Sequence, residues 1–196
     1  MTPIVFHFDV ISPFAYLAFG QLPEALVGCS HVVEYRPVLF AGLLKAHGHK
    51  GPAEIEPKRE WTFRQVDWLA KKLGLTAMRT PVPHPFNPLA LLRLSLASGP
   101  AGRMPNRRIV EALMRHVWQA DGADPNEPAR LAELRADLAP ERDPDSDEVK
   151  AELRALTDAA IARGVFGVPT FEALGRLYWG LDALPMLRED LLAARA

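Results

Sequence analysis

The spacing of hydrophobic positions changes twice along the chain and divides it into three parts. Residues 4–8 and 32–39 are short apolar runs typical of buried strands. Between them, residues 14–26 are rich in alanine, leucine and aromatic side chains and predict a helix, with Ser12 as its N-cap and Pro13 at its first position. The opening is therefore a β-α-β unit, in which the two strands are parallel neighbours.

From about residue 41 to residue 164 the pattern is helical. The clearest case has Val149, Leu153, Leu156 and Ala160 at positions i, i+4, i+7 and i+11. Trp61, Trp68, Leu69 and Leu73 also recur at roughly helical spacing. The predicted helices cover residues 58–73, 88–97, 106–118 with Asn106 as cap, 128–138, and a segment that starts with a capping box at Asp145 and Glu148 and ends before Gly164.

Strand signals return after Pro169. Residues 170–174 and 177–179 read as a hairpin with its turn at Gly175-Arg176, and residues 184–194 read as a closing helix. The order β-α-β, helical block, β-β-α predicts an α/β thioredoxin fold with a large all-helical insertion. We expect a thioredoxin-like domain formed by residues 1–40 and 164–196, and an inserted helical domain over residues 41–163.

Composition narrows the class of protein. The 196 residues are 48% apolar with a formal net charge of −1, which fits a soluble globular protein and gives no basic footprint for nucleic acid. No run approaches 18 apolar residues, and the N-terminus lacks the basic segment of a signal peptide, so we expect no membrane association. Cys29 is the single cysteine and has no internal partner, which favours a reducing, cytoplasmic location.

Residues 164–171, Gly-Val-Phe-Gly-Val-Pro-Thr-Phe, are typical of the cis-proline loop of thioredoxin-fold proteins. A bond before proline adopts the cis form at a cost of roughly 0.5–1 kcal/mol. The loop faces the start of the first helix, where redox relatives carry Cys-x-x-Cys. Here that stretch runs from Ser12 to Ala15 and contains no thiol. The pattern predicts a protein that acts on the thiol of another molecule.

Ser12 has two interpretations: a helix N-cap, or a hydroxyl that faces a bound thiol. Lowering a thiol pKa by ~2 units requires about 2.7 kcal/mol. A hydrogen bond to a charged acceptor, worth roughly 1.5–3 kcal/mol, together with the helix dipole can supply it. Val168, before Pro169, offers backbone groups that can pair with an extended peptide. The natural small peptide with a thiol is glutathione.

Other candidates carry a structural alternative as well. Asp182 follows the last strand and is either the N-cap of the last helix or a holder of a γ-glutamyl group. His7 is expected to be a core histidine with its hydrogen bonds satisfied, and Asn87 to be a turn and helix cap. His47 and His49 lack a third ligand at suitable spacing, so no metal is predicted. The basic residues after the second strand are solvated surface groups or a rim for an anionic substrate: Lys45, His47, His49, Lys50, Lys58 and Arg59.

Taken together, these segments resemble the 2-hydroxychromene-2-carboxylate isomerases, which are grouped with kappa-class glutathione transferases and DsbA-type oxidoreductases. The likeness spans nearly the whole chain. The motifs that carry it are Phe8-Asp9, Ser12-Pro13, Tyr16-Leu17-Ala18, Arg36-Pro37-Val38-Leu39, Gly42-Leu43-Leu44-Lys45 with Gly48, Pro57-Lys58-Arg59 with Trp61, Pro85-Phe86-Asn87-Pro88-Leu89 with Arg93, residues 164–171, and Trp179-Gly180 with Asp182.

The resemblance implies a glutathione-dependent isomerase of aromatic degradation, in which Ser12 faces the glutathione sulfur. It places the other glutathione contacts at Val168, Pro169, Leu181 and Asp182. It places contacts with a small aromatic carboxylate at Lys45, His49, Lys50 and Asn87. His49 departs from the asparagine expected in the family, and Leu181-Asp182-Ala183 departs from the more usual Ser-Asp-Arg or Gln-Asp-Arg. Whether the chain forms a homodimer is open.

The implied reaction needs no redox cofactor or metal. Reversible thiolate addition turns a conjugated double bond into a single bond, and rotation and elimination follow. The nearest alternative is a kappa-like glutathione transferase or peroxidase. A non-enzymatic peptide-binding module that uses the same proline loop is a third possibility. A disulfide oxidoreductase is disfavoured because Ser12 and Ala15 replace both thiols.

Overall fold

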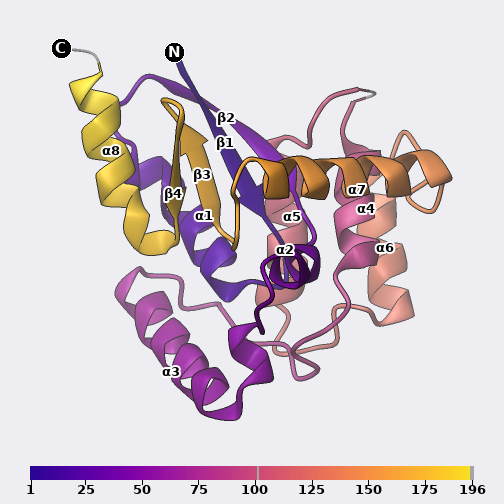
Figure 1. The fold of residues 1–196 in the computed structure, drawn as a ribbon. Coiled ribbons are helices and arrows are strands. Elements are labelled where there is room, and N and C mark those ends of the chain that lie inside the picture. Colours follow the sequence, from indigo (N-terminus) through magenta and orange to yellow (C-terminus); the bar gives the residue numbers. More distant parts are fainter. Residues whose placement is uncertain (101, 195–196) are drawn as a thin grey trace.

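A computed structural model describes residues 1–100 and 102–194 of the chain (Figure 1). Its centre is a four-stranded sheet with the order β2-β1-β3-β4. β1 (Thr2–Phe8) pairs in parallel with β2 (His31–Pro37) and antiparallel with β3 (Thr170–Ala173). β3 pairs antiparallel with β4 (Arg176–Trp179). The arrangement confirms the predicted thioredoxin fold.

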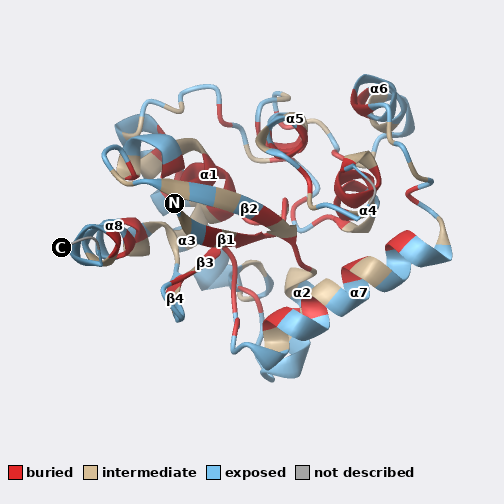
Figure 2. Ribbon diagram, turned by 90° about the horizontal axis from the view of Figure 1, so that it is seen from above, coloured by how far each residue is buried: buried red, intermediate tan, exposed pale blue. Residues whose placement is uncertain are grey.

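Alternation along β1 builds the core. Ile4, Phe6 and Phe8 are fully buried on the face of the sheet that α1 (Pro13–Ala25) covers, whereas α2 and α7 lie on the opposite side (Figure 2). Phe6 stacks on Phe171 of β3 with 5.0 Å between ring centroids. The closing helix α8 (Leu184–Ala193) packs against α1 and adds Leu184, Leu187 and Leu191 to the core. The two ends of the sequence thus form one packed unit.

Between β2 and β3 all the described secondary structure is helical, as predicted. The elements are α2 (Phe40–Ala46), the short 3₁₀ helix η1 (Pro52–Glu54), α3 (Glu56–Lys72), α4 (Leu89–Ser98), α5 (Arg107–Trp118), α6 (Pro128–Leu138) and α7 (Asp147–Ala162). Asn106 caps α5, and Gly164 follows α7 with a φ of +91° that glycine adopts without strain. The division into a discontinuous domain and an insertion stays a prediction, because the largest buried cluster contains residues of both parts.

Several local predictions of caps and turns are wrong. Ser146 caps α7 by accepting a hydrogen bond from the amide of Val149 at 3.3 Å, so Asp145 and Glu148 form no capping box. The hairpin turn is Leu174-Gly175, since both residues have positive φ and Arg176 already belongs to β4. Asp182 does not cap α8. It lies within a 3₁₀ turn, η2 (Leu181–Ala183), that separates β4 from that helix.

The spacing on α3 marks a helix but not its buried face. Trp61 and Trp68 are 57% and 56% exposed, and the buried residues of α3 are Val66 and Ala70. The tryptophan rings instead form cation–π contacts. Arg64 lies over Trp61 at 4.6 Å from the ring centroid, and Lys72 lies over Trp68 at 4.7 Å. Within residues 1–100 and 102–194, no helix has the length and apolar character needed to span a bilayer.

Candidate functional site

Ser12 joins the two ends of the sequence. It is the N-cap of α1, where its Oγ accepts a hydrogen bond from the amide of Ala15 at 3.2 Å. The same Oγ donates to the carbonyl oxygen of Val168 at 3.2 Å, across 156 residues of sequence. The Val168-Pro169 peptide bond is cis, as the sequence predicts. The start of the first helix and the cis-proline loop therefore meet at the hydroxyl of Ser12.

Val168 has unused hydrogen-bonding capacity in its backbone. Within the part of the chain that the structure describes, its amide donates to no protein group, and its carbonyl accepts only from the Ser12 hydroxyl. Pro169, by contrast, accepts a hydrogen bond from the amide of Gly180 at 2.9 Å, which fixes the loop to the end of β4. A buried backbone donor without a partner is energetically unfavourable. The amide and the carbonyl of Val168 are therefore available for hydrogen bonds with an extended peptide.

Buried polar groups hold the loop that carries Ser12. The carboxylate of Asp9 accepts hydrogen bonds from the amides of Ile11 at 3.0 Å and Phe40 at 2.9 Å. The ring Nε2 of His84 donates to the carbonyl of Ile11 at 2.9 Å, and burial lowers the pKa of His84. The indole of Trp118 donates to the carbonyl of Val10 at 3.0 Å. The position of Ser12 is therefore set by groups from α2, α5 and the loop before α4.

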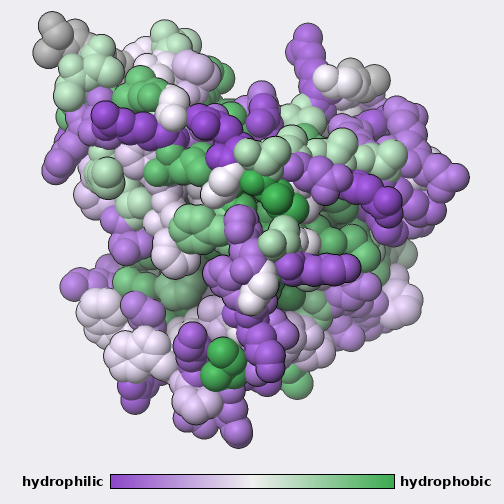
Figure 3. Space-filling model, in the orientation of Figure 1, coloured by the Kyte–Doolittle hydropathy of each residue, from purple (hydrophilic) through white to green (hydrophobic). Residues whose placement is uncertain are grey.

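A cleft of about 760 Å³ opens beside this junction. Its walls come from α1, α3, the cis-proline loop, η2 and α8, and apolar surface lies between α3 and the body of the protein (Figure 3). The apolar lining residues are Phe14, Ala25, Leu69, Leu73, Val168, Pro169, Trp179, Leu181, Leu184 and Pro185. The polar ones are Gln21, Glu24, Gln65, Asp182 and Arg188, together with Gly180.

The cleft brings together four of the residues predicted to bind glutathione. Val168, Pro169, Leu181 and Asp182 all line it, although the sequence separates them into two groups. Ser12 is 7% exposed and is not part of the lining, but Phe14, two residues further on, is. The Ser12 hydroxyl thus lies behind the cleft wall, in contact with Val168.

The residues predicted to bind substrate lie elsewhere. Lys45, His49 and Lys50 are exposed in and after α2, and none of them lines the cleft. Asn87 is exposed, and its Oδ1 accepts a hydrogen bond from the amide of Leu89 at 3.1 Å, which fits the predicted turn, but the N-cap of α4 is Pro88 and not Asn87. Arg59, a candidate for the basic rim, donates to the carbonyl of His84 at 2.7 Å. The structure does not join these side chains to the glutathione candidates.

Comparison with known proteins matches residues 3–192 to the DsbA-like thioredoxin domain. The chain belongs to this family. It is also 30% identical over 198 residues to the 2-hydroxychromene-2-carboxylate isomerase of Sphingobium xenophagum, covering 96% of this chain and 97% of that protein. The predicted resemblance is therefore confirmed.

Two further comparisons agree. Glutathione S-transferase kappa 2 of Caenorhabditis elegans is 26% identical, with 96% of this chain and 91% of that protein covered. The solved structure of a 2-hydroxychromene-2-carboxylate isomerase superposes with a TM-score of 0.82 at 23% identity, covering 98% of this chain and 95% of that one. Within the family, this chain differs from a dithiol oxidoreductase by the absence of both thiols at Ser12 and Ala15.

Sequence reasoning missed the side walls of the cleft. Gln65, Leu69 and Leu73 share one face of α3 and its end at i, i+4 and i+8, and Leu184 and Arg188 share one face of α8. The spacing was available in the sequence, since residues four apart lie on the same helix face. The sequence could not show that these helix faces line a cleft, because that depends on the tertiary packing.

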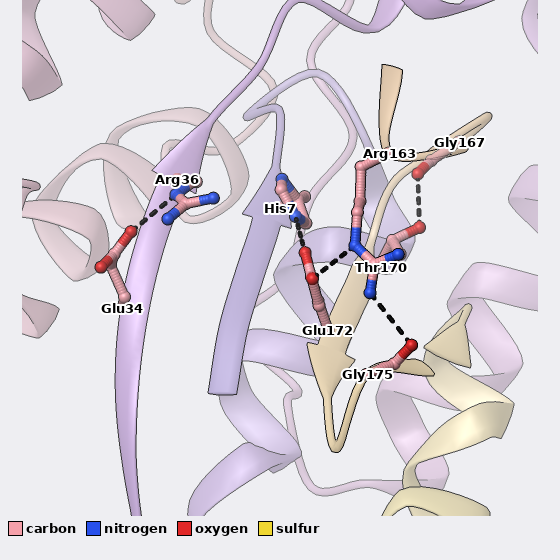
Figure 4. Close-up of polar contacts among 8 residues, drawn as sticks. All are labelled: His7, Glu34, Arg36, Arg163, Gly167, Thr170, Glu172 and Gly175. Carbon is pink, nitrogen blue, oxygen red and sulfur yellow. Dashed lines mark hydrogen bonds and ion pairs between the residues drawn. The ribbon is translucent and has the colours of Figure 1, made fainter. Parts of the chain in front are cut away.

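His7 lies on the other face of the sheet and is not the satisfied core histidine that we predicted (Figure 4). It is 1% exposed, and neither ring nitrogen forms a hydrogen bond. Its Nε2 lies 3.7 Å from a carboxylate oxygen of Glu172, which is held by Arg163 at 2.6 Å. Burial, and then the nearby Arg36, lower the pKa of His7. Glu172, which also pairs with Arg163, acts in the opposite direction and raises the pKa of His7.

Proposed function

We propose that this protein is a glutathione-dependent isomerase that interconverts 2-hydroxychromene-2-carboxylate and trans-o-hydroxybenzylidenepyruvate. The observation that carries the proposal is the contact of Ser12 Oγ with the carbonyl of Val168, beside cis-Pro169, in a chain with no thiol at that junction. Relatives named as isomerases align over nearly the full length, which supports the same class of chemistry.

The residues of the cleft fit glutathione. The free amide and the carbonyl of Val168 can pair with the main chain of its cysteine. Glu24, Asp182 and Arg188 line the same cleft, and Arg188 has no ion-pair partner among residues 1–100 and 102–194. Two carboxylates and one guanidinium suit the ammonium and carboxylate of a γ-glutamyl group.

Ser12 has one hydroxyl proton, which it donates to Val168 in the absence of a ligand. A thiolate within reach of Ser12 Oγ is a stronger acceptor than this carbonyl, so the hydroxyl would turn and donate its proton to the sulfur atom instead. The Ser12 oxygen still accepts from the amide of Ala15, so the hydroxyl stays at the helix N-terminus, where the dipole favours an anion. Ligand binding thus prepares Ser12 to stabilise a thiolate.

Bound glutathione would supply the thiolate for reversible addition to the conjugated double bond of the substrate. The protein's own contribution is to orient that thiolate through Val168 and to stabilise its charge through Ser12. Phe14, Leu69 and Leu181 give the cleft apolar walls beside this position. We retain Lys45, His49, Lys50 and Asn87 as proposed substrate contacts.

Titration calorimetry with glutathione tests the first half of the proposal, and an absorbance assay on hydroxychromene carboxylate tests the second. We expect glutathione to bind, to raise the melting temperature by mass action, and to be required for turnover. No heat and no thermal shift at millimolar glutathione would contradict the proposal outright.

A kappa-like glutathione transferase is the second candidate, because two kappa-class relatives align with 26% and 27% identity. The two functions share the glutathione site and differ in the second substrate. Conjugation of an electrophilic aryl halide without isomerisation of the chromene would favour the transferase.

A further inference from the structure

Asp9 is a fully buried carboxylate that connects two segments of the site. Its Oδ1 accepts from the amide of Ile11, within its own loop, and its Oδ2 accepts from the amide of Phe40, the first residue of α2. Its backbone carbonyl accepts from the amide of Ser12 at 3.1 Å. One residue therefore holds the Ser12 loop and the first turn of α2 to each other.

The hydrogen bonds of Asp9 depend on its charge. An ionised carboxylate accepts from both amides with charge assistance, and protonation weakens both bonds while adding a hydroxyl that needs its own acceptor. Burial raises the pKa of Asp9 to about 7, against the opposing effect of the two amides. Near neutral pH both protonation states are therefore accessible.

The surroundings of Asp9 contain little other charge. From the loop before α4, His84 contacts the Asp9 loop through the carbonyl of Ile11, and from α5 Trp118 contacts it through Val10. From α7, Thr157 accepts from the amide of Leu39, next to Phe40. Across the described ranges 1–100 and 102–194, no acidic or basic side chain forms an ion pair with Asp9. His84 is thus the other titratable group to control for.

We propose that Asp9 is a positioning residue: by holding the amides of Ile11 and Phe40, its ionised carboxylate fixes the loop that presents Ser12 to Val168, and its protonation loosens that loop and weakens ligand binding in the cleft. The change at the Asp9 hydrogen bonds takes place in the free protein. Only its effect on ligand binding rests on the proposed glutathione site. The effect reaches the cleft through two short connections: the bond from the Ile11 amide to the Asp9 carboxylate, next to Ser12 in the chain, and the bond from Ser12 to Val168.

The first experiment needs no ligand. Nuclear magnetic resonance of the free protein follows the side-chain carboxyl carbon of Asp9 and the amides of Ile11 and Phe40 from pH 5.5 to 8.5. We expect the three signals to titrate with one common midpoint near 7. Asp9→Asn removes this titration from both amides, whereas Asp158→Asn, an exposed position on α7, leaves it unchanged. Amides that do not titrate in the wild type, or that still titrate in Asp9→Asn because His84 is responsible, overturn the proposal.

The second experiment measures the affinity for S-methylglutathione, which has no thiol to ionise. We expect wild-type affinity to rise about fivefold or more from pH 6 to pH 8, within the usual range for coupled sites. The affinity of Asp9→Asn should be lower and independent of pH over that range. An affinity that is flat in the wild type contradicts the coupling of Asp9 to the cleft. An absence of binding at every pH, with the amide titration intact, rejects the glutathione site and leaves the Asp9 junction standing.

Discussion

At the scale of single residues, the site depends on one hydroxyl with two partners. Ser12 accepts from the amide of Ala15 as any N-cap serine does, and it also donates to Val168. The first contact is common to many helices, and Ser146 makes the same contact at the start of α7. The second contact is specific to the junction with the cis-proline loop. Substitution can therefore separate the two roles.

Ser12→Ala should lower turnover of hydroxychromene carboxylate by about 10²–10³-fold, the scale for loss of one donor to a developing anion. It should also cost about 1 kcal/mol of unfolding free energy, as N-cap serines typically do. Ser146→Ala is the matched control, because it removes a cap far from the cleft. Steady-state kinetics and denaturant unfolding measure both effects. Full activity in Ser12→Ala, with a loss of stability equal to that of Ser146→Ala, would show that Ser12 is only a cap.

Arg188→Gln should weaken glutathione binding by about 1.4- to fivefold, since exposed ion pairs contribute roughly 0.2–1 kcal/mol. The position lines the cleft on α8 and has no ion pair with any residue that the structure describes. Arg154→Gln on α7, also exposed, serves as the control. Calorimetry at constant ionic strength measures the change. Equal affinities for the wild type and Arg188→Gln would remove Arg188 from the site.

At the scale of elements, α3 stands out as the wall of the cleft with the fewest anchors. Only Val66 and Ala70 of its 17 residues are buried, whereas α5 buries six. Its end is tied to α1 by a hydrogen bond of 3.4 Å from Gln21 to the carbonyl of Leu73. Elements with few buried contacts open at low free energy. A wall of this kind can adjust to a ligand while the sheet and α1 stay fixed.

We therefore expect amide hydrogen exchange to be faster in α3 than in α5, and to slow in α3 when glutathione binds. Val66→Ala should increase the exchange of α3 further while leaving the sheet unchanged. Exchange detected by mass spectrometry, with and without glutathione, resolves these segments. Equal protection of α3 and α5 in the free protein would show that the exposed tryptophan face does not leave α3 loosely held.

At the scale of the whole molecule, buried histidines couple stability to pH. Burial lowers the pKa values of His7, His84 and His116 below the ordinary value. The unfolded chain therefore binds more protons than the native state as the pH falls through about 6.5, the ordinary value for histidine, so stability declines with acid. Asp9 has the opposite effect on stability. Its raised pKa makes the native state bind more protons than the unfolded chain between about pH 4 and pH 7, so its contribution to stability falls as the pH rises.

The melting temperature should consequently fall less steeply between pH 7.5 and pH 5.5 in His7→Asn than in the wild type. The slope is the quantity to compare, because the substitution also changes packing at a buried site. His49→Asn, at an exposed position, should keep the wild-type slope. Calorimetric melting in buffers of equal ionic strength measures it. An unchanged slope in His7→Asn would show that protonation of His7 does not destabilise the native state, because Glu172 stabilises the protonated ring.

Much of this protein was determined by the sequence alone. Apolar runs and helical spacing predicted the described strands and α-helices to within a few residues, apart from the short helix α2, because period 2 and period 3.6 follow from backbone geometry. The run over residues 164–171, with Ser12-Pro13 and no cysteine pair, predicted the cis-proline loop and the family. Local chemistry sufficed in these cases, since each feature depends on neighbours in sequence.

Other features were decided only by tertiary structure. Spacing could not show that Trp61 and Trp68 face outward. A helical pattern shows which residues share a face of the helix, but not whether that face packs on the protein or faces solvent. Nor could it show that Lys45 and Asn87 stay outside the cleft that Asp182 and Arg188 enter. The bond from Asp9 to Phe40 spans 31 residues, and that from Ser12 to Val168 spans 156. Such contacts exist only once the sheet brings distant loops to one edge, because no local pattern encodes which loops will meet.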